Sequence, residues 1–123
     1  MLKKILLIED VPDMQKVIAY RLKAGGYAVV TASDGLEGIK KAETEKPDLI
    51  VSDYALPKMT GSEIVRHLRG SEKTRHIPIV VLSAYVRRNM EKAVEVPADV
   101  YLSKPFDAGE LMSTIEKLLA KSS

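Results

Sequence analysis

Short runs of apolar residues alternate along the chain with longer segments in which apolar positions recur every three or four residues. The short runs are rich in β-branched residues and are typical of strands, whereas the longer period is typical of helices that bury one face. Strict alternation of the two indicates a parallel sheet built from βαβ units, with helices on both faces. The pattern predicts strands at residues 4–8, 28–31, 49–52, 79–82 and 100–102.

Residues typical of helix ends mark where the predicted helices start and stop. The first helix begins near Pro12, whose missing N–H would be unpaired in a first turn anyway, and it ends at Gly25 and Gly26. Three further starts carry the spacing of a capping box. These pairs are Asp34 with Glu37, Thr60 with Glu63, and Asp107 with Glu110.

The helical periodicity also predicts which residues face the core. In the first helix the predicted stripe consists of Met14, Val17, Ile18 and Leu22, and in the last helix it consists of Leu111, Ile115, Leu118 and Leu119. A helix between residues 86 and 94 is predicted on weaker grounds, because this segment has few apolar positions and no clear cap. With this helix the chain has five strands and five helices, which predicts one doubly wound α/β domain over residues 1–123.

Acidic residues follow two of the predicted strands. Glu9 and Asp10 come directly after the first strand, and Asp53 comes directly after the third. Because right-handed crossovers make these two strands neighbours, the three carboxylates are expected to converge at one edge of the sheet. Doubly wound sheets bind ligands at this edge, outside the carboxyl ends of their strands.

Three converging carboxylates repel one another unless a cation or a raised pKa relieves the repulsion, or unless they lie further apart than expected. The fourth strand ends near Ser83 and the fifth is followed by Lys104, so a hydroxyl and an ammonium group are expected at the same edge. Oxygen ligands suit Mg²⁺, which takes one or two carboxylates together with phosphate oxygens. The set is therefore a plausible site for Mg²⁺ and a phosphoryl group, with Lys104 pairing with the remaining charge.

Composition limits the alternatives. The chain has 123 residues, of which 46% are hydrophobic and 29% charged, as expected for one soluble globular domain. The absence of cysteine excludes disulfides and thiolate metal sites. No apolar run approaches the roughly 20 residues of a membrane span, and the acidic start is unlike a signal peptide, so a cytoplasmic protein without a membrane partner is expected. A net charge of +2 argues against direct nucleic-acid binding.

Several motifs resemble the response-regulator receiver domain of two-component signalling, the CheY-like family, over essentially the whole chain. They are the pair Glu9 and Asp10, "DLIVSDYALPKMTG" with Asp53, "HIPIVVLSA" with Ser83, and "ADVYLSKPF" with Tyr101, Lys104 and Pro105. Each motif alone is weak, but their occurrence in order at the expected strand ends is a strong signal. The resemblance implies a flavodoxin-like (βα)5 domain with strand order 2-1-3-4-5.

By this resemblance, Asp53 is the phosphoacceptor, and its donor is a phosphohistidine on a sensor histidine kinase or a histidine phosphotransfer protein. Asp10, Asp53 and the backbone carbonyl of Ala55 are expected to bind Mg²⁺ directly. Glu9 is expected to act mainly through water. The downstream target and the cognate kinase are not encoded in these motifs.

The resemblance also implies roles on the other two strands. Ser83 and Lys104 are expected to hold the phosphoryl oxygens, Tyr101 is expected to be the aromatic switch, and the Lys104–Pro105 bond is expected to be cis. Movement of Ser83 and Tyr101 then biases the face made by the fourth helix, the fifth strand and the fifth helix. Such a protein promotes its own phosphorylation and dephosphorylation and is not a turnover enzyme.

Other interpretations of the same residues remain open. Glu9 and Asp10 could merely cap the helix that begins at Pro12, and Tyr101 could be an ordinary aromatic residue of an edge strand. The domain could be a degenerate receiver used for docking or dimerisation, or a phosphatase of the haloacid dehalogenase type. That phosphatase family requires a second aspartate two residues after the first, where this chain has Ala55.

The sequence also departs from the family pattern. Val11 follows the acidic pair where a polar residue is frequent, Pro97 stands where glycine is common, and Ser83 and Lys104 are about one residue closer together than usual. The fourth helix or its loop is therefore expected to be shortened, which affects the expected output face. No effector domain is expected after the last helix, and the protein is expected to be a monomer or a weak phosphorylation-linked dimer.

Overall fold

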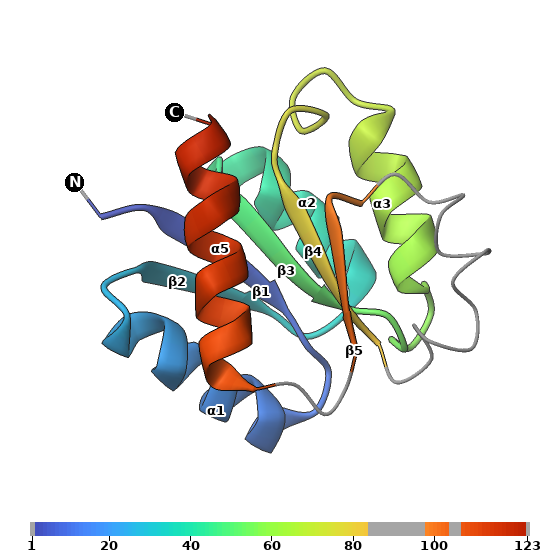
Figure 1. Ribbon diagram of the computed structural model, residues 1–123. Helices are drawn as coiled ribbons and strands as arrows, with labels where there is room; N and C mark the ends of the chain where they lie inside the picture. The colour runs from blue at the N-terminus through green and yellow to red at the C-terminus, as the bar shows by residue number, and fades with distance from the viewer. Residues whose placement is uncertain (1, 84–97, 104–106, 123) are drawn as a thin grey trace.

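The computed structural model describes residues 2–83, 98–103 and 107–122 (Figure 1). These residues form a five-stranded parallel sheet in the order β2-β1-β3-β4-β5, as predicted. The strands are β1 (Lys4–Ile8), β2 (Ala28–Ala32), β3 (Leu49–Asp53), β4 (Ile79–Ser83) and β5 (Val100–Ser103). The helices within this part of the chain are α1 (Pro12–Ala24), α2 (Gly35–Glu45), α3 (Gly61–Arg69) and α5 (Ala108–Ser122).

The strands match their predicted positions closely. β1 has the predicted bounds, and each of the other four ends one residue later than predicted. For β3 and β4 the difference matters, because the extra residues are Asp53 and Ser83, which therefore lie in the sheet rather than after it. The helix predicted over residues 86–94, Pro97 and the Lys104–Pro105 bond lie outside the described residues.

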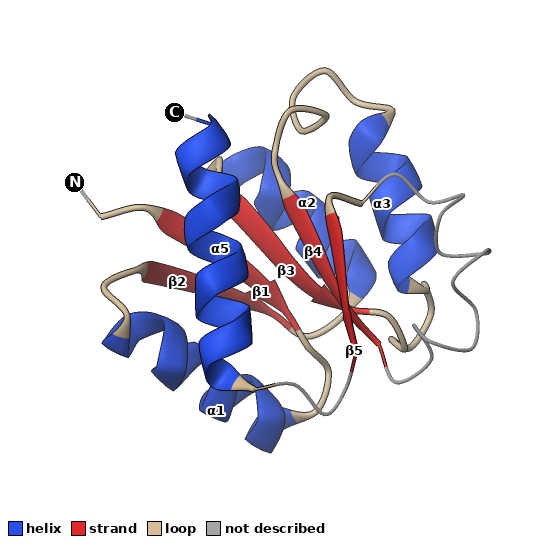
Figure 2. Cartoon of the chain, in the orientation of Figure 1, coloured by secondary structure: helices blue, strands red, loops and turns tan. Residues whose placement is uncertain are grey.

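Helices cover both faces of the sheet (Figures 1 and 2). α1 and α5 pack on one face, where Ile18, Leu22 and Ile115 contact one set of strand residues. α2 and α3 pack on the other face, where Ile39 and Ile64 contact the alternate set. Central strands covered in this way lose water from both faces, which explains why they are continuously apolar. The cores also fix the sheet's register, because a one-residue shift would turn every buried side chain to the opposite face.

The prediction for the buried stripe of α1 is partly wrong. Ile18 and Leu22 are buried as predicted, but Met14 is 40% exposed and Val17 is 54% exposed. Val17 lies roughly 100° around the helix from Ile18, so it points away from the face that packs on the sheet. Met14 lies in the first turn of α1. Apolar side chains therefore remain on the surface of this helix.

Capping residues explain the other helix starts. The Oδ1 of Asp34 accepts the N–H of Glu37 at 2.8 Å, and Thr60 with Glu63 forms a complete capping box. Before α5, the Oδ1 of Asp107 accepts the N–H of Gly109 at 2.8 Å. At α1 the N-cap is Val11, which makes no side-chain cap hydrogen bond. The Oε2 of Glu9 accepts the N–H of Val11 at 3.4 Å, so the alternative in which Glu9 and Asp10 cap α1 stays a hypothesis.

Gly38 lets α2 approach the last residue of β1. A Cβ atom on Gly38 would lie 2.5 Å from Cδ1 and 2.9 Å from Cγ1 of Ile8, a side chain with no exposed surface. Overpacking of this kind costs about 1–3 kcal/mol, whereas Ala gains only about 1 kcal/mol over Gly in a helix. Gly38→Ala is therefore expected to lower the free energy of unfolding by up to about 2 kcal/mol, measured by urea denaturation.

Gly109→Ala is the matched control for Gly38→Ala. Its nearest contact would be 3.4 Å from Oδ1 of Asp107, which is ordinary van der Waals distance. This variant is expected to keep or raise the stability by up to about 1 kcal/mol. Equal losses in both variants would contradict the packing explanation for Gly38.

Candidate functional site

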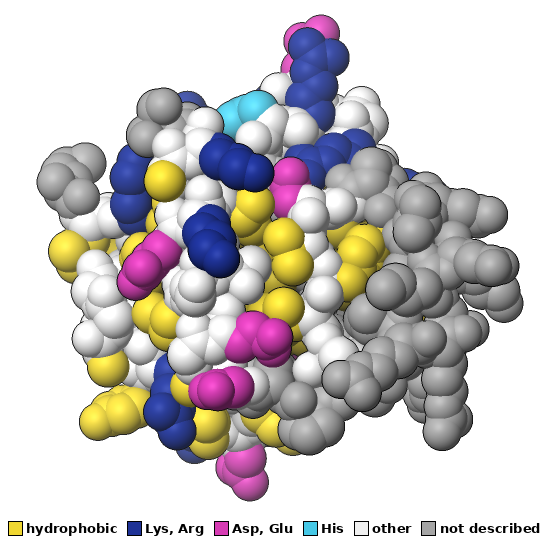
Figure 3. Space-filling view, viewed as in Figure 1, with side chains coloured by type: hydrophobic (Ala, Val, Ile, Leu, Met, Phe, Trp, Pro, Cys, Tyr) yellow, Lys and Arg dark blue, Asp and Glu magenta, His cyan; other side chains and the backbone are white. Residues whose placement is uncertain are grey.

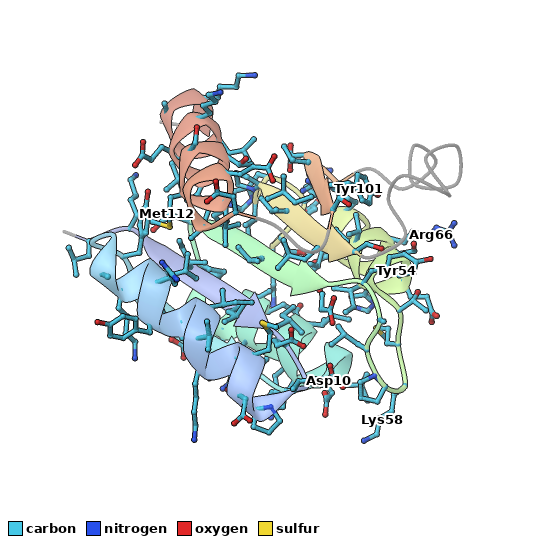
Figure 4. All side chains as sticks on the ribbon, turned by 60° about the horizontal axis from the view of Figure 1, so that its bottom comes forward. Asp10, Tyr54, Lys58, Arg66, Tyr101 and Met112 are labelled. Carbon is cyan, nitrogen blue, oxygen red and sulfur yellow. The ribbon has the colours of Figure 1, made fainter. Side chains whose placement is uncertain are left out.

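The carboxyl ends of β1 and β3 bring three acidic residues together. Parallel pairing sets Ile8 opposite Ser52, so Glu9, which follows β1, comes beside Asp53 at the end of β3. Single carboxylate oxygens of Glu9, Asp10 and Asp53 all lie within 4.8 Å of one another. Figure 4 shows Asp10 at this edge, with Lys58 on the loop that follows β3. The predicted convergence of the three carboxylates is confirmed.

Burial strengthens the repulsion among these three carboxylates. Glu9 is only 1% exposed and Asp53 only 7% exposed, while Asp10 is half-buried. Like charges at such distances repel, and burial reduces the screening by water. All donors are hard oxygen atoms, and the chain contains no cysteine that would favour a softer metal. The arrangement therefore fits a small divalent cation that takes carboxylate oxygens and water.

Backbone hydrogen bonds fix the orientation of Asp53. The N–H of Tyr54 donates to the Oδ1 of Asp53 at 3.0 Å and to the carbonyl oxygen of Leu82 at 2.8 Å. The hydroxyl of Ser52 donates to the carbonyl oxygen of Asp53 at 3.0 Å. The strand end that carries the Asp53 carboxylate is thus hydrogen-bonded to β4 through the next residue, Tyr54. A carboxylate that is held in this way needs little reorganisation when a reaction partner arrives.

The loop from β3 to α3 folds back against the same residues. Met59 N–H donates to the carbonyl oxygen of Pro57 at 2.8 Å, and the residue between them, Lys58, has a left-handed φ of 71°. Gly61 N–H then donates to the carbonyl oxygen of Tyr54 at 2.7 Å, which closes the loop. Ala55 lies in this loop with an exposed side chain, two residues after the central carboxylate. Its carbonyl role in metal binding stays a prediction.

Gly61 is required where the loop touches Asp53 and Tyr54. A Cβ atom on Gly61 would lie 2.8 Å from Cα of Tyr54 and 3.1 Å from the carbonyl oxygen of Asp53. Both are backbone atoms, so the strand end that carries the carboxylate would have to move. Gly61→Ala is expected to cost about 1–3 kcal/mol of stability in urea denaturation.

Gly70→Ala provides the comparison for Gly61→Ala. Gly70 ends α3 with a φ of −81°, and a Cβ atom there would lie 3.4 Å from its nearest neighbour, the carbonyl oxygen of Arg66. This variant is expected to change the stability little. Unchanged stability of Gly61→Ala would show that the close approach is not needed.

Ser83 and Tyr101 lie on one face of the sheet. Val81 pairs with Tyr101 across β4 and β5, and both belong to the core beneath α2 and α3. Ser83 is two residues after Val81, so its side chain points to the same face. Ser83 is 5% exposed. Tyr101 is half-buried, and burial raises the pKa of its phenol. Ser83 and Tyr101 are therefore diagonal neighbours on adjacent strands. Lys104 lies outside the described residues.

Gln15, which was not among the predicted site residues, also contacts this edge. Its side-chain amide donates to the carbonyl oxygen of Glu9 at 2.9 Å and to that of Ala32 at 3.3 Å. No residue-type signal in the sequence indicates this contact, because both acceptors are backbone atoms. The only available signal is the position of Gln15 in the first turns of α1, shortly after the acidic pair.

Other features of the described residues lie away from the acidic cluster. A cleft of about 830 Å³ opens at the opposite end of the sheet, with Lys3, Lys46, Asp48 and His76 among its lining residues. The side chains of His67 and His76 are both exposed. None of the helices seen in the described ranges is long and apolar enough to cross a bilayer.

Comparison with known proteins agrees with this geometry. The family model for the response regulator receiver domain matches residues 5–116. The alkaline phosphatase synthesis transcriptional regulatory protein PhoP of Bacillus subtilis is 42% identical over 121 residues, which are 98% of this chain but only 50% of that protein. The polar-differentiation response regulator DivK of Brucella ovis is 30% identical over 120 residues, covering 97% of this chain and 98% of DivK.

A solved structure gives the same result. The receiver domain of the sensor histidine kinase PA1611 from Pseudomonas aeruginosa PAO1 superposes with a TM-score of 0.90 at 31% identity, covering 98% of this chain and 99% of that one. It is described with a magnesium ion coordinated in the active site cleft. The similarity therefore extends over the fold and over the region where the three carboxylates meet.

Proposed function

Because this chain belongs to the response regulator receiver domain family, we propose that it accepts a phosphoryl group on Asp53 from a phosphohistidine of a sensor histidine kinase or a histidine phosphotransfer protein. The observation that carries the proposal is the convergence of Glu9, Asp10 and Asp53 within 4.8 Å at the carboxyl edge of the sheet. Receiver domains of this family act as phosphoryl acceptors rather than as enzymes that turn over an external substrate.

The oxygen-only donor set suits Mg²⁺. In this proposal Asp10, Asp53 and the carbonyl of Ala55 bind the ion directly, and Glu9 binds it through water. Bound Mg²⁺ supplies positive charge that lets two anions, the carboxylate and the phosphoryl group, approach each other. The magnesium described in the Pseudomonas receiver domain supports this assignment.

In the reaction, a carboxylate oxygen of Asp53 attacks phosphorus, and the bond between phosphorus and the histidine nitrogen breaks. The electron pair of that bond stays on the imidazole, which then takes up a proton. The N–H of Tyr54 at 3.0 Å from Oδ1 keeps the carboxylate oriented for attack. Lys104 and Ser83 are proposed to hold the phosphoryl oxygens.

Phosphorylation adds nearly two negative charges and three strong acceptor oxygens at the strand ends. We propose that the hydroxyl of Ser83 turns toward these oxygens and that Tyr101 follows, because the two side chains share one face of neighbouring strands. To move the domain from a mostly inactive to a mostly active conformation, the phosphoryl group must stabilise the active conformation by about 5 kcal/mol more than the inactive one. A few charge-assisted hydrogen bonds can supply this difference. The proposed output face includes β5 and α5.

A phosphohistidine donor is itself a protein, so a protein-binding surface is expected near Asp53. Exposed apolar side chains follow the acidic pair along α1 at intervals of three residues. They are Val11, Met14, Val17 and Tyr20, with exposures of 51%, 40%, 54% and 74%. Figure 3 shows hydrophobic side chains reaching the surface at the lower left, where α1 lies in Figure 1. Steps of three residues advance about 300° around a helix, so these side chains are spread around the exposed part of α1. We propose that the donor contacts some of them when it docks beside Asp53.

The proposal is tested by incubating the protein with a small-molecule phosphodonor in Mg²⁺ or in EDTA and measuring the intact mass. One phosphoryl group is expected per chain in Mg²⁺, none in EDTA, and hydroxylamine should remove it, as it does any acyl phosphate. Absence of an adduct, together with no binding of beryllofluoride, would favour a domain used only for docking. Continuous hydrolysis of phosphomonoesters would instead favour a haloacid-dehalogenase-type phosphatase.

A further inference from the structure

We infer that Gln15 is a positioning residue that holds Glu9 and Asp10 in place for the divalent cation. The inference rests on the proposed function, because it concerns the same cation site. The side chain of Gln15 contacts the backbone carbonyl of Glu9 and not its carboxylate. Gln15 lies on α1 and is half-buried, next to the loop that joins β1 to this helix.

The side-chain amide of Gln15 ties together the ends of two strands. Its Nε2 donates to the carbonyl oxygen of Glu9 at 2.9 Å, to that of Ala32 at 3.3 Å and, most weakly, to the hydroxyl of Ser33 at 3.5 Å. The N–H of Glu9 also donates to the carbonyl oxygen of Ala32 at 3.0 Å. One amide therefore fixes the peptide of Glu9 relative to the carboxyl end of β2.

The N-cap of α1 adds little to the anchoring of the loop between β1 and this helix. The N-cap residue Val11 makes no side-chain cap hydrogen bond, and its N–H reaches the Oε2 of Glu9 only at 3.4 Å. Without a cation, repulsion among the three carboxylates pushes Glu9 and Asp10 away from Asp53. The hydrogen bond from Gln15 to Glu9 opposes that displacement. It therefore keeps the carboxylates near the spacing that a small cation requires.

A second observation separates this role from ordinary helix stabilisation. The backbone N–H of Gln15 already makes the first bond of α1, to the carbonyl oxygen of Val11 at 2.9 Å. The side chain adds nothing to the hydrogen bonds within α1. Its two backbone acceptors are Glu9, which follows β1, and Ala32, the last residue of β2. Hydrogen-bond partners that orient metal ligands typically change metal affinity by 10–100-fold when removed. A loss of about tenfold in Mg²⁺ affinity is expected here.

The test compares Gln15→Met with wild type. Methionine has a similar length and forms helices well, but it has no N–H donor. We expect the dissociation constant for Mg²⁺, measured by NMR titration, to rise about tenfold, while the urea midpoint of the metal-free protein changes little. At saturating Mg²⁺ the phosphorylation rate should return close to the wild-type rate. Thr114→Val is the matched control, because it removes a side-chain bond to the Glu110 carbonyl at 2.8 Å far from the site.

Gln15→Glu makes the test independent of how well the methionine variant folds. An added carboxylate would strengthen Mg²⁺ binding if only charge mattered, but it cannot donate to the Glu9 carbonyl. We expect weaker Mg²⁺ binding in spite of the added negative charge. Unchanged or tighter Mg²⁺ binding in Gln15→Glu would overturn the inference while leaving the proposed function intact. Failure of the wild type itself to bind Mg²⁺ would instead overturn the proposed function.

Discussion

Replacing Asp53 with asparagine is expected to abolish stable phosphorylation. The amide of asparagine is a far weaker nucleophile than a carboxylate and cannot form an acyl phosphate by the same step. Asn keeps the size of the side chain and can still accept the N–H of Tyr54, which donates to Oδ1 at 3.0 Å in the wild type. The fold is therefore expected to persist. Intact mass after incubation with Mg²⁺ and a phosphodonor should show no adduct on Asp53→Asn.

Asp13→Asn is the control for this experiment. Asp13 is an exposed carboxylate in the first turn of α1, three residues after Asp10, and it lies outside the acidic cluster. Its variant should be phosphorylated to the wild-type level. If Asp53→Asn still carried a hydroxylamine-sensitive phosphoryl group, another carboxylate would have to be the acceptor, and the assignment of Asp53 would be wrong.

Asp10→Asn is expected to weaken Mg²⁺ binding strongly, by about 100-fold if a direct ligand is lost. An ion that binds only the folded state stabilises it by about 2.7 kcal/mol when present at 100 times its dissociation constant. At the same Mg²⁺ concentration, a variant that binds about 100-fold more weakly gains only about 0.4 kcal/mol. Urea denaturation with and without Mg²⁺ measures this difference directly.

The metal-free state separates the two possible roles of Asp10. Its carboxylate lies within 4.8 Å of those of Glu9 and Asp53, so removing one negative charge relieves repulsion. Without Mg²⁺ the variant is therefore expected to be at least as stable as the wild type. A variant that is less stable without Mg²⁺, yet gains as much from Mg²⁺ as the wild type, would show that Asp10 supports the fold and not the ion.

The acidic cluster was predictable from the residues themselves, whereas the full strand order followed from the resemblance to the receiver family. Apolar runs located the strands, and right-handed crossovers made β1 and β3 neighbours, which brought Asp53 beside Glu9. The exposed positions of Met14 and Val17 were not predicted. Periodicity finds an apolar face of a helix, but it does not show which part of that face is buried.

Contacts between side chains and backbone atoms could not be predicted from the sequence either. Gln15 donates to a carbonyl 17 residues away, at Ala32, and any residue type offers the same acceptor. No pattern of side chains can therefore indicate this contact. The same applies to the close approach of Gly61 to Tyr54, which only the folded loop reveals. The roles of Ala55, Lys104 and Pro105 stay predictions.

The most direct measurement of the central claim is to identify the phosphorylated residue in the wild-type protein. Borohydride reduces an acyl phosphate to an alcohol, so a phosphorylated aspartate becomes homoserine, which peptide mass spectrometry locates. After reaction with a phosphodonor in Mg²⁺, the account predicts homoserine at position 53 and none in a sample kept in EDTA. Homoserine at position 10 or elsewhere, or its absence from every peptide of a protein that carries phosphate, would contradict the account.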